Sequence, residues 1–570
     1  MDAERFVFNG INGTTGDYLQ SPLTPEEVYK IAQSKSQYEK YHPKKEYIQN
    51  LTDRKKKSSF RLKPGVDGKD LSQTGWGIIF AHNENPKIEE ALSELLKHRQ
   101  SQAKDKYKKY IYDAEEQESK TDFLARYGVG YGAVDPKNVP YYLLIVGDPE
   151  TISYRFQCEL DVQYAVGRIY FETPEEYAQY ARSVVEAETG KHSFSRRASF
   201  FGVENDDATQ LSANYLVKPL ANYLSENLQD WKLLNWDVKT IVGEQATKAQ
   251  LKQLLGGSET PSLLFTASHG MGFDINDTRF PKHQGALICQ DWSGQRGNKI
   301  PEEVYFSGDD ISSDANLLGL IAFHFACYSA GTPKLSEFSD YGDLLSKRSE
   351  IALNSFVAHL PQRLLGHPNG GALAVIGHVE RAWACSFRLS DQYNKEFQQL
   401  QVFESAIDLL MKGYPIGFAF DFFNEAHAEL ATSLSKELQE IRYKNQKMTE
   451  RDLSKLWLTT QDMANYVIMG DPAVRLVVSD NADSNDTAPR RIEPVILHSP
   501  QTSNFPKAMV SEAPQESFSE ELGKSRFQQA QIHLSQTLEE FIEAAKDRAE
   551  QLESIIYSAN TLLEALKKLN

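Results

Sequence analysis

The sequence predicts an α/β protein whose sheets are mostly parallel, with helices packed on both faces. Short apolar runs recur along much of the chain, and they lack the strict alternation of a strand that has one side in water. Amphipathic segments of helical period separate several of these runs. Glycine, proline or charged residues bound each run, as is usual where a buried strand ends.

The predicted elements follow in chain order. A first helix covers LTPEEVYKIAQS (23–34), because Thr24 can cap it and Pro25 suits its first turn. The predicted strands are GWGIIFAH (75–82), YYLLIVGD (141–148), ASFFGVE (198–204), VKTIVG (238–243), SLLFTASHG (262–270), LIAFHFAC (320–327), ALAVIGHV (372–379) and YVIMGDPAVRLVV (466–478). Two of the helices between them are PEEYAQYARSVVEAE (174–188) and SANYLVKPLANYLSENL (212–228).

Length and composition bound the possible functions. With 570 residues the chain is long enough for two to four structural units. Hydrophobic residues make up 40% and aromatic residues 11% of the chain, which excludes global disorder. The net charge of -17 argues against a general role in nucleic-acid binding, because affinity for phosphates needs clustered lysine and arginine. The one dense basic run, DRKKK (53–57), is more typical of a solvated loop than of a binding patch.

The sequence also predicts a cytoplasmic protein with reduced thiols, no membrane association and no cofactor. The stretch MDAERFVFNG (1–10) shows no basic start followed by an apolar run, so no signal peptide is visible. No run reaches the ~18 apolar residues of a membrane span. The cysteines, Cys158, Cys289, Cys327 and Cys385, lie far apart without a CxxC pair, which argues against a disulfide scaffold or a zinc ribbon.

The two ends of the chain differ from its centre. Residues 1–70 are polar and irregular apart from their one helix, and residues 480–516 have the proline, serine and asparagine of a linker. Residues 517–570 are predicted to form a C-terminal helix with an apolar stripe at 3–4 spacing, made of Leu538, Phe541, Ala545, Leu552, Ile555, Ala559, Leu562, Leu566 and Leu569. The stripe is compatible with docking on the body of the protein or with a coiled coil formed with a partner.

A cysteine lies where one buried strand gives way to turn-forming residues, in FHFACYSAGTP (323–333). Cys327 therefore lies at the carboxyl end of a strand, where open α/β sheets bind their ligands. A cysteine nucleophile needs a base within hydrogen-bond reach, because the thiolate is the attacking species. His324 cannot be that base, since residues three apart in a strand face opposite ways and lie about 10 Å apart along it. A buried histidine with satisfied hydrogen bonds is the favoured interpretation of His324.

His269 is the better candidate for the base. It ends LLFTASHG (263–270) as Cys327 ends its own strand, and two neighbouring parallel strands would bring both side chains to one edge of the sheet. Gly270 allows a sharp turn, and its N–H can point at an oxyanion beside the N–H of Cys327. The spacing therefore predicts a Cys–His dyad.

These residues resemble a known family. TASHG (266–270) followed by FACYSAG (325–331) resembles the His-Gly and Ala-Cys motifs of the caspase-like (clan CD) cysteine peptidases, which include caspases, gingipains, separases and bacterial CHAT-type peptidases. Over roughly residues 75 to 478 the chain resembles the gingipain-type (C25) branch, with seven short motifs in the branch's order. The resemblance implies a caspase-like fold with two tandem subdomains, a non-catalytic one at residues 71–192 and a catalytic one at 193–479.

The resemblance also assigns roles to residues. It implies that Cys327 is the nucleophile, that His269 is the general acid and base, and that Glu204 in FFGVEN orients the histidine. Trp383, in HVERAWACSF (378–387), falls where the family has an aromatic wall for the pocket of the residue before the scissile bond. Glu204 is equally compatible with a solvated carboxylate, and Trp383 with an ordinary core tryptophan.

Two features depart from the family pattern. Gingipains are exported, whereas this chain shows no signal. Arg-selective members carry an acidic pocket residue downstream of the glutamate that corresponds to Glu204, where this chain has Tyr215. Selectivity for a basic residue is therefore not implied, although Asp206, Asp207 or Glu380 could supply charge from elsewhere.

The expected function is that of an intracellular cysteine endopeptidase that acts on proteins or peptides and is regulated by processing or by a partner. The polar stretch 276–313 is compatible with a lid, a cleavage site or a plain loop, and the C-terminal helix is a candidate partner site. Intracellular members of the broader group act in stress, death or anti-phage pathways, and the resemblance extends that expectation to this chain.

Two alternatives stay open. A catalytically inactive, caspase-like interaction module would keep the fold without the chemistry, and the intact His269, Gly270 and Cys327 weigh against it. A metal site built from His269, Cys327 and Cys289 lacks the compact spacing of metal ligands.

Overall fold

The computed structural model of the chain describes residues 5–38, 62–338, 349–478 and 490–497, with short gaps at 64, 116, 131, 191, 193, 228–235, 391–395, 399 and 443–447. The chain divides into a unit of residues 1–497 and a second unit of residues 498–570. The predicted C-terminal helix and most of the predicted linker lie outside the described residues.

One sheet extends through the described part of the first unit. Its ten strands stand in the order β3 (Tyr107–Tyr112), β2 (Trp76–Ala81), β4 (Tyr142–Val146), β5 (Ala165–Ile169), β18 (Tyr466–Gly470), β15 (Ala374–His378), β12 (Ile321–Phe325), β8 (Leu263–Ala267), β6 (Arg197–Gly202) and β7 (Asp237–Val242). Neighbouring strands are parallel except at the antiparallel junction of β18 with β15. The sheet thus joins two parallel blocks that run in opposite directions, and the predicted α/β class with mostly parallel strands is confirmed.

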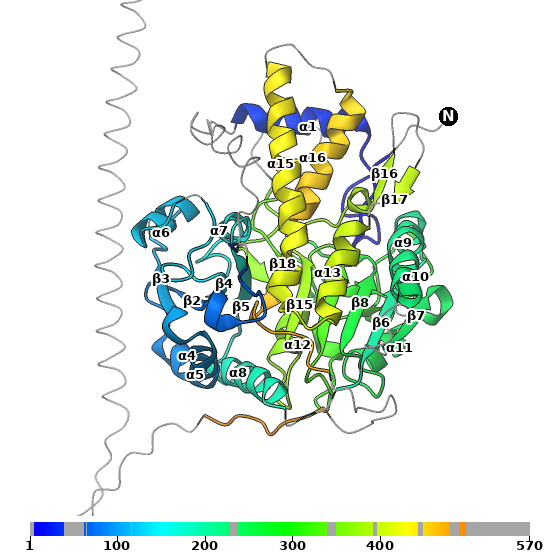
Figure 1. The fold of residues 1–570 in the computed structure, drawn as a ribbon. Coiled ribbons are helices and arrows are strands. Elements are labelled where there is room, and N and C mark those ends of the chain that lie inside the picture. The colour runs from blue at the N-terminus through cyan, green and yellow to red at the C-terminus, as the bar shows by residue number, and fades with distance from the viewer. Residues whose placement is uncertain are drawn as a thin grey trace, which may run out of the picture. The chain divides into compact units, whose positions relative to one another are not determined.

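Helices cover this sheet (Figure 1). They are α1 (Pro25–Tyr38), α3 (Leu71–Thr74), α4 (Pro86–Ala91), α5 (Ser93–Ala103), α6 (Lys120–Arg126), α7 (Tyr154–Asp161), α8 (Pro174–Glu188), α9 (Asp207–Ser212), α10 (Lys218–Asn227), α11 (Lys248–Leu254), α12 (His359–Leu365), α13 (Gln401–Met411), α14 (Ile416–Ala419), α15 (Asp421–Arg442) and α16 (Glu450–Asn465). In Figure 1, α4, α5 and α8 lie below the strands β2, β4 and β5, while α6 and α7 lie above them.

Local sequence explains where several of these helices begin. Thr173 caps α8 and pairs with Glu176 in a reciprocal capping box, and a proline occupies the first turn. Thr24 and Glu27 make the same exchange at the start of α1, where the sequence predicts a helix. Helix α1 lies across α16, and Ser454 of α16 donates a hydrogen bond of 2.7 Å to the carbonyl of Pro25.

The two parallel blocks of the sheet are not consecutive in the sequence, and the division into subdomains at residues 71–192 and 193–479 stays a prediction. Strand β18 falls in the predicted range 193–479, yet it pairs with β5 of the first block through Ile468 and Met469. Strands pair with their neighbours in space, whatever their order along the chain, so β18, the last strand among the described residues, stands between β5 and β15.

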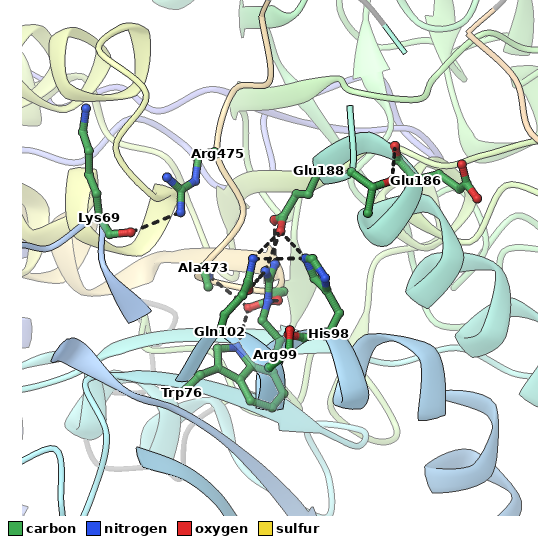
Figure 2. Close-up of polar contacts among 12 residues, drawn as sticks. Lys69, Trp76, His98, Arg99, Gln102, Glu186, Glu188, Ala473 and Arg475 are labelled. Carbon is green, nitrogen blue, oxygen red and sulfur yellow. Dashed lines mark hydrogen bonds and ion pairs between the residues drawn. The ribbon is translucent and has the colours of Figure 1, made fainter. Parts of the chain in front are cut away.

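A buried charge network fixes the turn after β18 to the helices α5 and α8 (Figure 2). Arg99 of α5 is 1% exposed, donates to the carboxylate of Asp471 at 2.6 Å and binds Glu188 of α8 through two nitrogens at 2.6 and 2.8 Å. The Trp76 indole N–H also donates to Asp471, at 2.9 Å. Burial alone would raise the pKa of Glu188, but the Arg99 guanidinium outweighs it and holds that pKa well below its usual range.

A second, smaller sheet lies at the carboxyl end of β8. It has the order β1 (Gly10–Asn12), β9 (Gly270–Gly272), β10 (Leu287–Ile288) and β11 (Tyr305–Phe306). Its apolar residues form a separate small core that contains Ile11, Met271, Phe273, Ala286, Ile288, Trp292, Ile300 and Tyr305. Part of the stretch 276–313 is therefore a folded support for β1, which was expected to lie in an irregular N-terminal segment.

Residues 490–497, predicted as linker, run in extended form over the body of the protein. Ile492 donates to the carbonyl of Asn369 at 2.8 Å, and Val495 donates to the side chain of Gln179 at 2.7 Å. Of the described helices, none has the length and the apolar content needed to cross a membrane.

Candidate active site

The predicted nucleophile and base follow two adjacent strands. Strands β8 and β12 are parallel neighbours, and Ala267 stands opposite Phe325 at their carboxyl ends. His269 and Cys327 each follow two residues later, so both leave the sheet at the same edge. The prediction that these strands are parallel neighbours is confirmed.

Close packing at this edge explains the glycine after the histidine. A Cβ atom on Gly270 would lie 1.8 Å from the carbonyl oxygen of Cys327, far inside van der Waals contact. After the cysteine, Tyr328 takes a left-handed backbone conformation with φ of 58°, which makes the turn at the strand end sharp. The Tyr328 N–H is held by the carbonyl of Glu380 at 3.0 Å.

The Cys327 thiol is fully buried in this conformation. Its Sγ accepts a hydrogen bond of 3.2 Å from the backbone N–H of Ala382. Burial raises the pKa of the Cys327 thiol well above its usual range, although the Ala382 N–H and the nearby Arg381 oppose that rise. The sulfur is therefore a neutral thiol while the site is covered.

The His269 ring is held by a carboxylate. Its Nε2 lies 2.9 and 3.0 Å from the two carboxylate oxygens of Asp206, while its Nδ1 has no hydrogen-bond partner among the described residues. The rings of Tyr18 and Trp292 flank it edge-on, with centroids 5.9 and 6.0 Å away. Nδ1 is thus the nitrogen left to exchange a proton with a reacting group.

Asp206 is fixed by a second set of contacts. It caps the start of α9 in a reciprocal exchange with Thr209, and the Tyr18 hydroxyl donates to it at 2.8 Å. Burial alone would raise the pKa of Asp206, but His269 and these donors outweigh it and hold that pKa well below its usual range. The carboxylate is therefore ionised and can stabilise a charged imidazole.

Glu204, which the resemblance offered as the orienting group, does not take this position. Its carboxylate forms an ion pair with Lys218 at 2.7 Å and is partly exposed, whereas the hydrogen bonds of His269 go to Asp206. Glu204 lies in the loop after β6. Asp206 is the capping residue directly before α9, and its carboxylate reaches His269 from there. The spacing Asp206-x-x-Thr209, a capping box, was the signal in the sequence that could have identified it.

Two backbone donors converge on a single oxygen beside the thiol. The N–H groups of Gly270 and Cys327 donate to the carbonyl of Asn9, at 2.9 and 3.1 Å. These are the two donors that the sequence predicts for an oxyanion. Asn9 was not singled out from the sequence, because it lies more than 250 residues before both of its partners and left no local signal.

Trp383 and His324 make contacts of their own near this arrangement. The Trp383 ring packs against Phe8, with ring centroids 5.0 Å apart, and against Phe338 at 5.1 Å. It thus contacts the residue that precedes Asn9. His324 shares a hydrogen bond of 2.8 Å with Thr266, and burial lowers the pKa of His324 to about 3.

The described residues hold no group of three or more histidine, cysteine, aspartate or glutamate side chains placed to bind a metal ion. Cys289, the third residue of the metal alternative, is buried, and its Sγ lies 3.6 Å from the carbonyl of Leu287.

Comparisons with known proteins agree with the resemblance. The model of one protein family, Peptidase family C25, matches residues 78–477 of this chain. No curated protein matches the chain.

Solved structures similar to the chain include proteases. The Arg-specific cysteine proteinase gingipain R (RgpB) is 13% identical with a TM-score of 0.40, covering 73% of this chain and 80% of its own. A structure described only as a protease is 12% identical with a TM-score of 0.40, covering 71% and 80%. The complex of the pro- and mature domains of RgpB from Porphyromonas gingivalis is 13% identical with a TM-score of 0.38, covering 70% and 80%. Because the family match extends over well more than half of the sequence, the chain belongs to peptidase family C25 and is a cysteine peptidase.

Proposed function

We propose that the protein is an endopeptidase that cleaves proteins by acyl transfer, with Cys327 as nucleophile and His269 as general acid and base. The observation that carries the proposal is the pair of N–H groups, from Gly270 and Cys327, that meet on one peptide carbonyl next to the thiol. Donors placed in this way stabilise the negative charge that develops on a carbonyl oxygen under attack.

The proposed reaction assigns a step to each of these groups. His269 Nδ1 takes the thiol proton, and the Cys327 sulfur attacks the carbonyl carbon of the substrate peptide bond. The tetrahedral oxyanion is held by the two N–H groups. His269 then protonates the leaving amine, and a water molecule hydrolyses the resulting thioester. Asp206 is a positioning residue, because it holds the Nε2 side of the ring and stabilises the imidazolium.

The proposal is tested by mapping cleavage sites in a proteome-derived peptide pool. Cys327→Ala should lower kcat/KM by at least about 10³-fold, as removal of a catalytic nucleophile does. The matched control is Cys158→Ala. Cys158 lies on the helix α7, and its thiol donates to the carbonyl of Ala464. Equal cleavage by the Cys327→Ala variant and the wild type would remove Cys327 from the mechanism.

An inactive module is the rival proposal, and the full burial of the thiol favours it. An electrophilic peptide probe separates the two, since a catalytic cysteine reacts once its cover opens and an inert one does not. Selective labelling of Cys327 supports the endopeptidase; absence of labelling together with absence of cleavage supports the module.

Regulation by residues 517–570 is kept as part of this proposal. Its test is deletion of that segment from the full chain. Unchanged activity after the deletion, with wild-type protein already at its maximum rate, would argue against a role for the C-terminal segment.

A further inference from the structure

The segment 6–12 crosses the candidate active site in the manner of a bound peptide. On one side of the thiol it pairs with the backbone after β15: the Asn9 N–H donates to the Ala382 carbonyl at 2.9 Å, and the Ala384 N–H donates to the Val7 carbonyl at 3.3 Å. Phe8 stands opposite Trp383 in an antiparallel bridge. Addition of an extended peptide to a free backbone edge is a common mode of peptide recognition.

On the other side of the thiol the segment continues as β1. Gly10, Ile11 and Asn12 pair in parallel with residues 270–272 of β9. Ile11 is fully buried in the small core beneath this sheet. Both directions of the segment are therefore held by backbone pairing, and the turn between them falls at Asn9 and Gly10.

The peptide bond between Asn9 and Gly10 lies at the reacting position. The Asn9 carbonyl fills the site of the two N–H donors. A Cβ atom built on Gly10 would lie 2.8 Å from Cys327 Sγ, so the sulfur is packed against the residue that follows this carbonyl. A bound substrate would present its scissile bond in the same place.

The Asn9 side chain is fully buried; its Oδ1 has no hydrogen-bond partner among the described residues, so hydrogen bonds recognise its Nδ2 alone. Its Nδ2 donates to Ser212 Oγ at 3.0 Å and to the Ser268 carbonyl at 3.3 Å. The Ser212 hydroxyl proton is engaged with the carbonyl of Thr209 at 3.0 Å, so Ser212 accepts here and does not donate. Both partners are acceptors, which identifies the buried atom as the amide nitrogen and not the amide oxygen.

Such a pocket discriminates between asparagine and its isostere. An aspartate carboxylate would face two acceptor oxygens without a donor, and a buried unpaired carboxylate is strongly disfavoured. Asn9 Nδ2 donates to a hydroxyl oxygen and to a carbonyl oxygen; both are neutral acceptors, and they match a short neutral amide.

Resting on the proposed function, we propose that the peptidase selects asparagine before the scissile bond, through Ser212 and Ser268, and that its own Asn9–Gly10 bond is a substrate. Cys327 Sγ attacks the Asn9 carbonyl carbon, the bond to the Gly10 nitrogen breaks, and His269 delivers the thiol proton to that nitrogen. One water then hydrolyses the thioester and leaves a carboxylate on Asn9 and an amine on Gly10. Residues before Gly10 are afterwards held only by noncovalent contacts, so their departure uncovers the thiol.

The experiment follows the full-length protein and its activity together. Mass spectrometry of the incubated protein should find a new N-terminus at Gly10 in the wild type and none in Cys327→Ala. Asn9→Asp should leave the chain intact, while Asn222→Asp, a control at an exposed position on α10, should be processed like the wild type. Cuts in a proteome-derived peptide pool should carry asparagine before the cleaved bond.

A second variant tests the pocket itself. Ser212→Ala removes one acceptor for the amide and should lower kcat/KM on a peptide with the sequence Val-Phe-Asn-Gly-Ile-Asn by about 3- to 10-fold. Ser225→Ala is the control, because Ser225 also bonds back to its own helix, at the carbonyl of Ala221, and lies on α10. The same peptide with aspartate in place of the first asparagine should not be cleaved.

The outcomes separate this inference from the proposed function. Cuts that depend on Cys327 but follow residues other than asparagine overturn the inference and leave the endopeptidase in place. Cleavage after asparagine in the pool, with an intact Asn9–Gly10 bond in the wild type, overturns self-processing. Absence of any cut that depends on Cys327, in the pool and in the chain itself, overturns the proposed function.

Discussion

At the scale of single residues, the site depends on a carboxylate two positions away from the expected one. Asp206 contacts both His269 and Tyr18, whereas Glu204 points to Lys218. A difference of two residues changes which carboxylate reaches His269, because α9 begins at Asp207. Asp206 caps this helix, and the capping hydrogen bonds fix the direction of its side chain.

The first prediction compares these two carboxylates. Asp206→Asn should lower kcat by about 10²- to 10⁴-fold with a much smaller change in KM, since the ring loses its orientation and the imidazolium its counter-charge. Glu204→Gln should stay close to the wild type. Steady-state kinetics on a cleaved peptide gives both values, and a large loss of kcat in Glu204→Gln alone would restore the original assignment.

The second prediction concerns Gly270. A methyl group there would press on the Cys327 carbonyl at 1.8 Å, so Gly270→Ala must displace the backbone that carries both N–H donors. Loss of one such donor costs about 10²- to 10³-fold in kcat, and a lower melting temperature should accompany it. Gly130→Ala is the control, because a Cβ atom at Gly130 meets nothing within 4 Å. Wild-type turnover by Gly270→Ala would contradict the predicted oxyanion site.

At the scale of elements, a few charged side chains fix the end of β18 to the helices α5 and α8. Arg99 of α5 joins Glu188 at the end of α8 to Asp471 after β18, and all three are nearly or fully buried. Apolar strand pairing alone does not explain why β18 ends at Gly470. The ion network positions the turn after β18, because Asp471 also accepts from the Ala473 N–H at 3.0 Å.

The third prediction follows from this network. Arg99→Met should lower the free energy of unfolding by about 3–5 kcal/mol, because two buried carboxylates lose their counter-charge. Arg155→Met removes an exposed arginine from a surface pair with Glu159 and should change the free energy by less than about 0.5 kcal/mol. Denaturant unfolding of both variants provides the comparison, and equal small effects would mean that the network is not structural.

At the scale of the whole molecule, buried neutral histidines make stability depend on pH. Burial lowers the pKa of His324 from 6.5 to about 3 and the pKa of His427 to about 4. The pKa values of these histidines are lower in the folded state than in the unfolded state. Below pH 6.5 the histidines of the unfolded chain therefore bind protons, while those of the folded protein stay neutral. The contribution of these histidines to the free energy of unfolding is therefore fully present above about pH 6.5 and is lost as the pH drops towards 3.

The fourth prediction puts a size on this effect. His324 alone should cost about 2 kcal/mol of unfolding free energy between pH 7.5 and pH 5, and His324→Gln should flatten that part of the curve. His82→Gln, at an exposed position, should keep the wild-type slope. Denaturant unfolding at a series of pH values tests it, and an unchanged slope in His324→Gln would show that the histidine does not titrate in this way.

The local pattern of the sequence was sufficient for the α/β class and for the placement of His269 and Cys327 at one sheet edge. Strand period, apolar content and the residues that end a strand are properties of neighbouring positions. Because the strands of any parallel sheet are buried on both faces, they show these properties in the same way. The start of α1 at Thr24 was predictable for the same reason.

Only the tertiary structure decided what meets at that edge. The choice of Asp206 over Glu204 depends on where α9 points, and the pairing of β18 with β5 depends on how the two blocks close. The passage of Asn9 over the Cys327 thiol joins residues more than 300 positions apart. Contacts of this kind leave no period in the sequence, because they are stabilised by the whole assembled surface and not by adjacent residues.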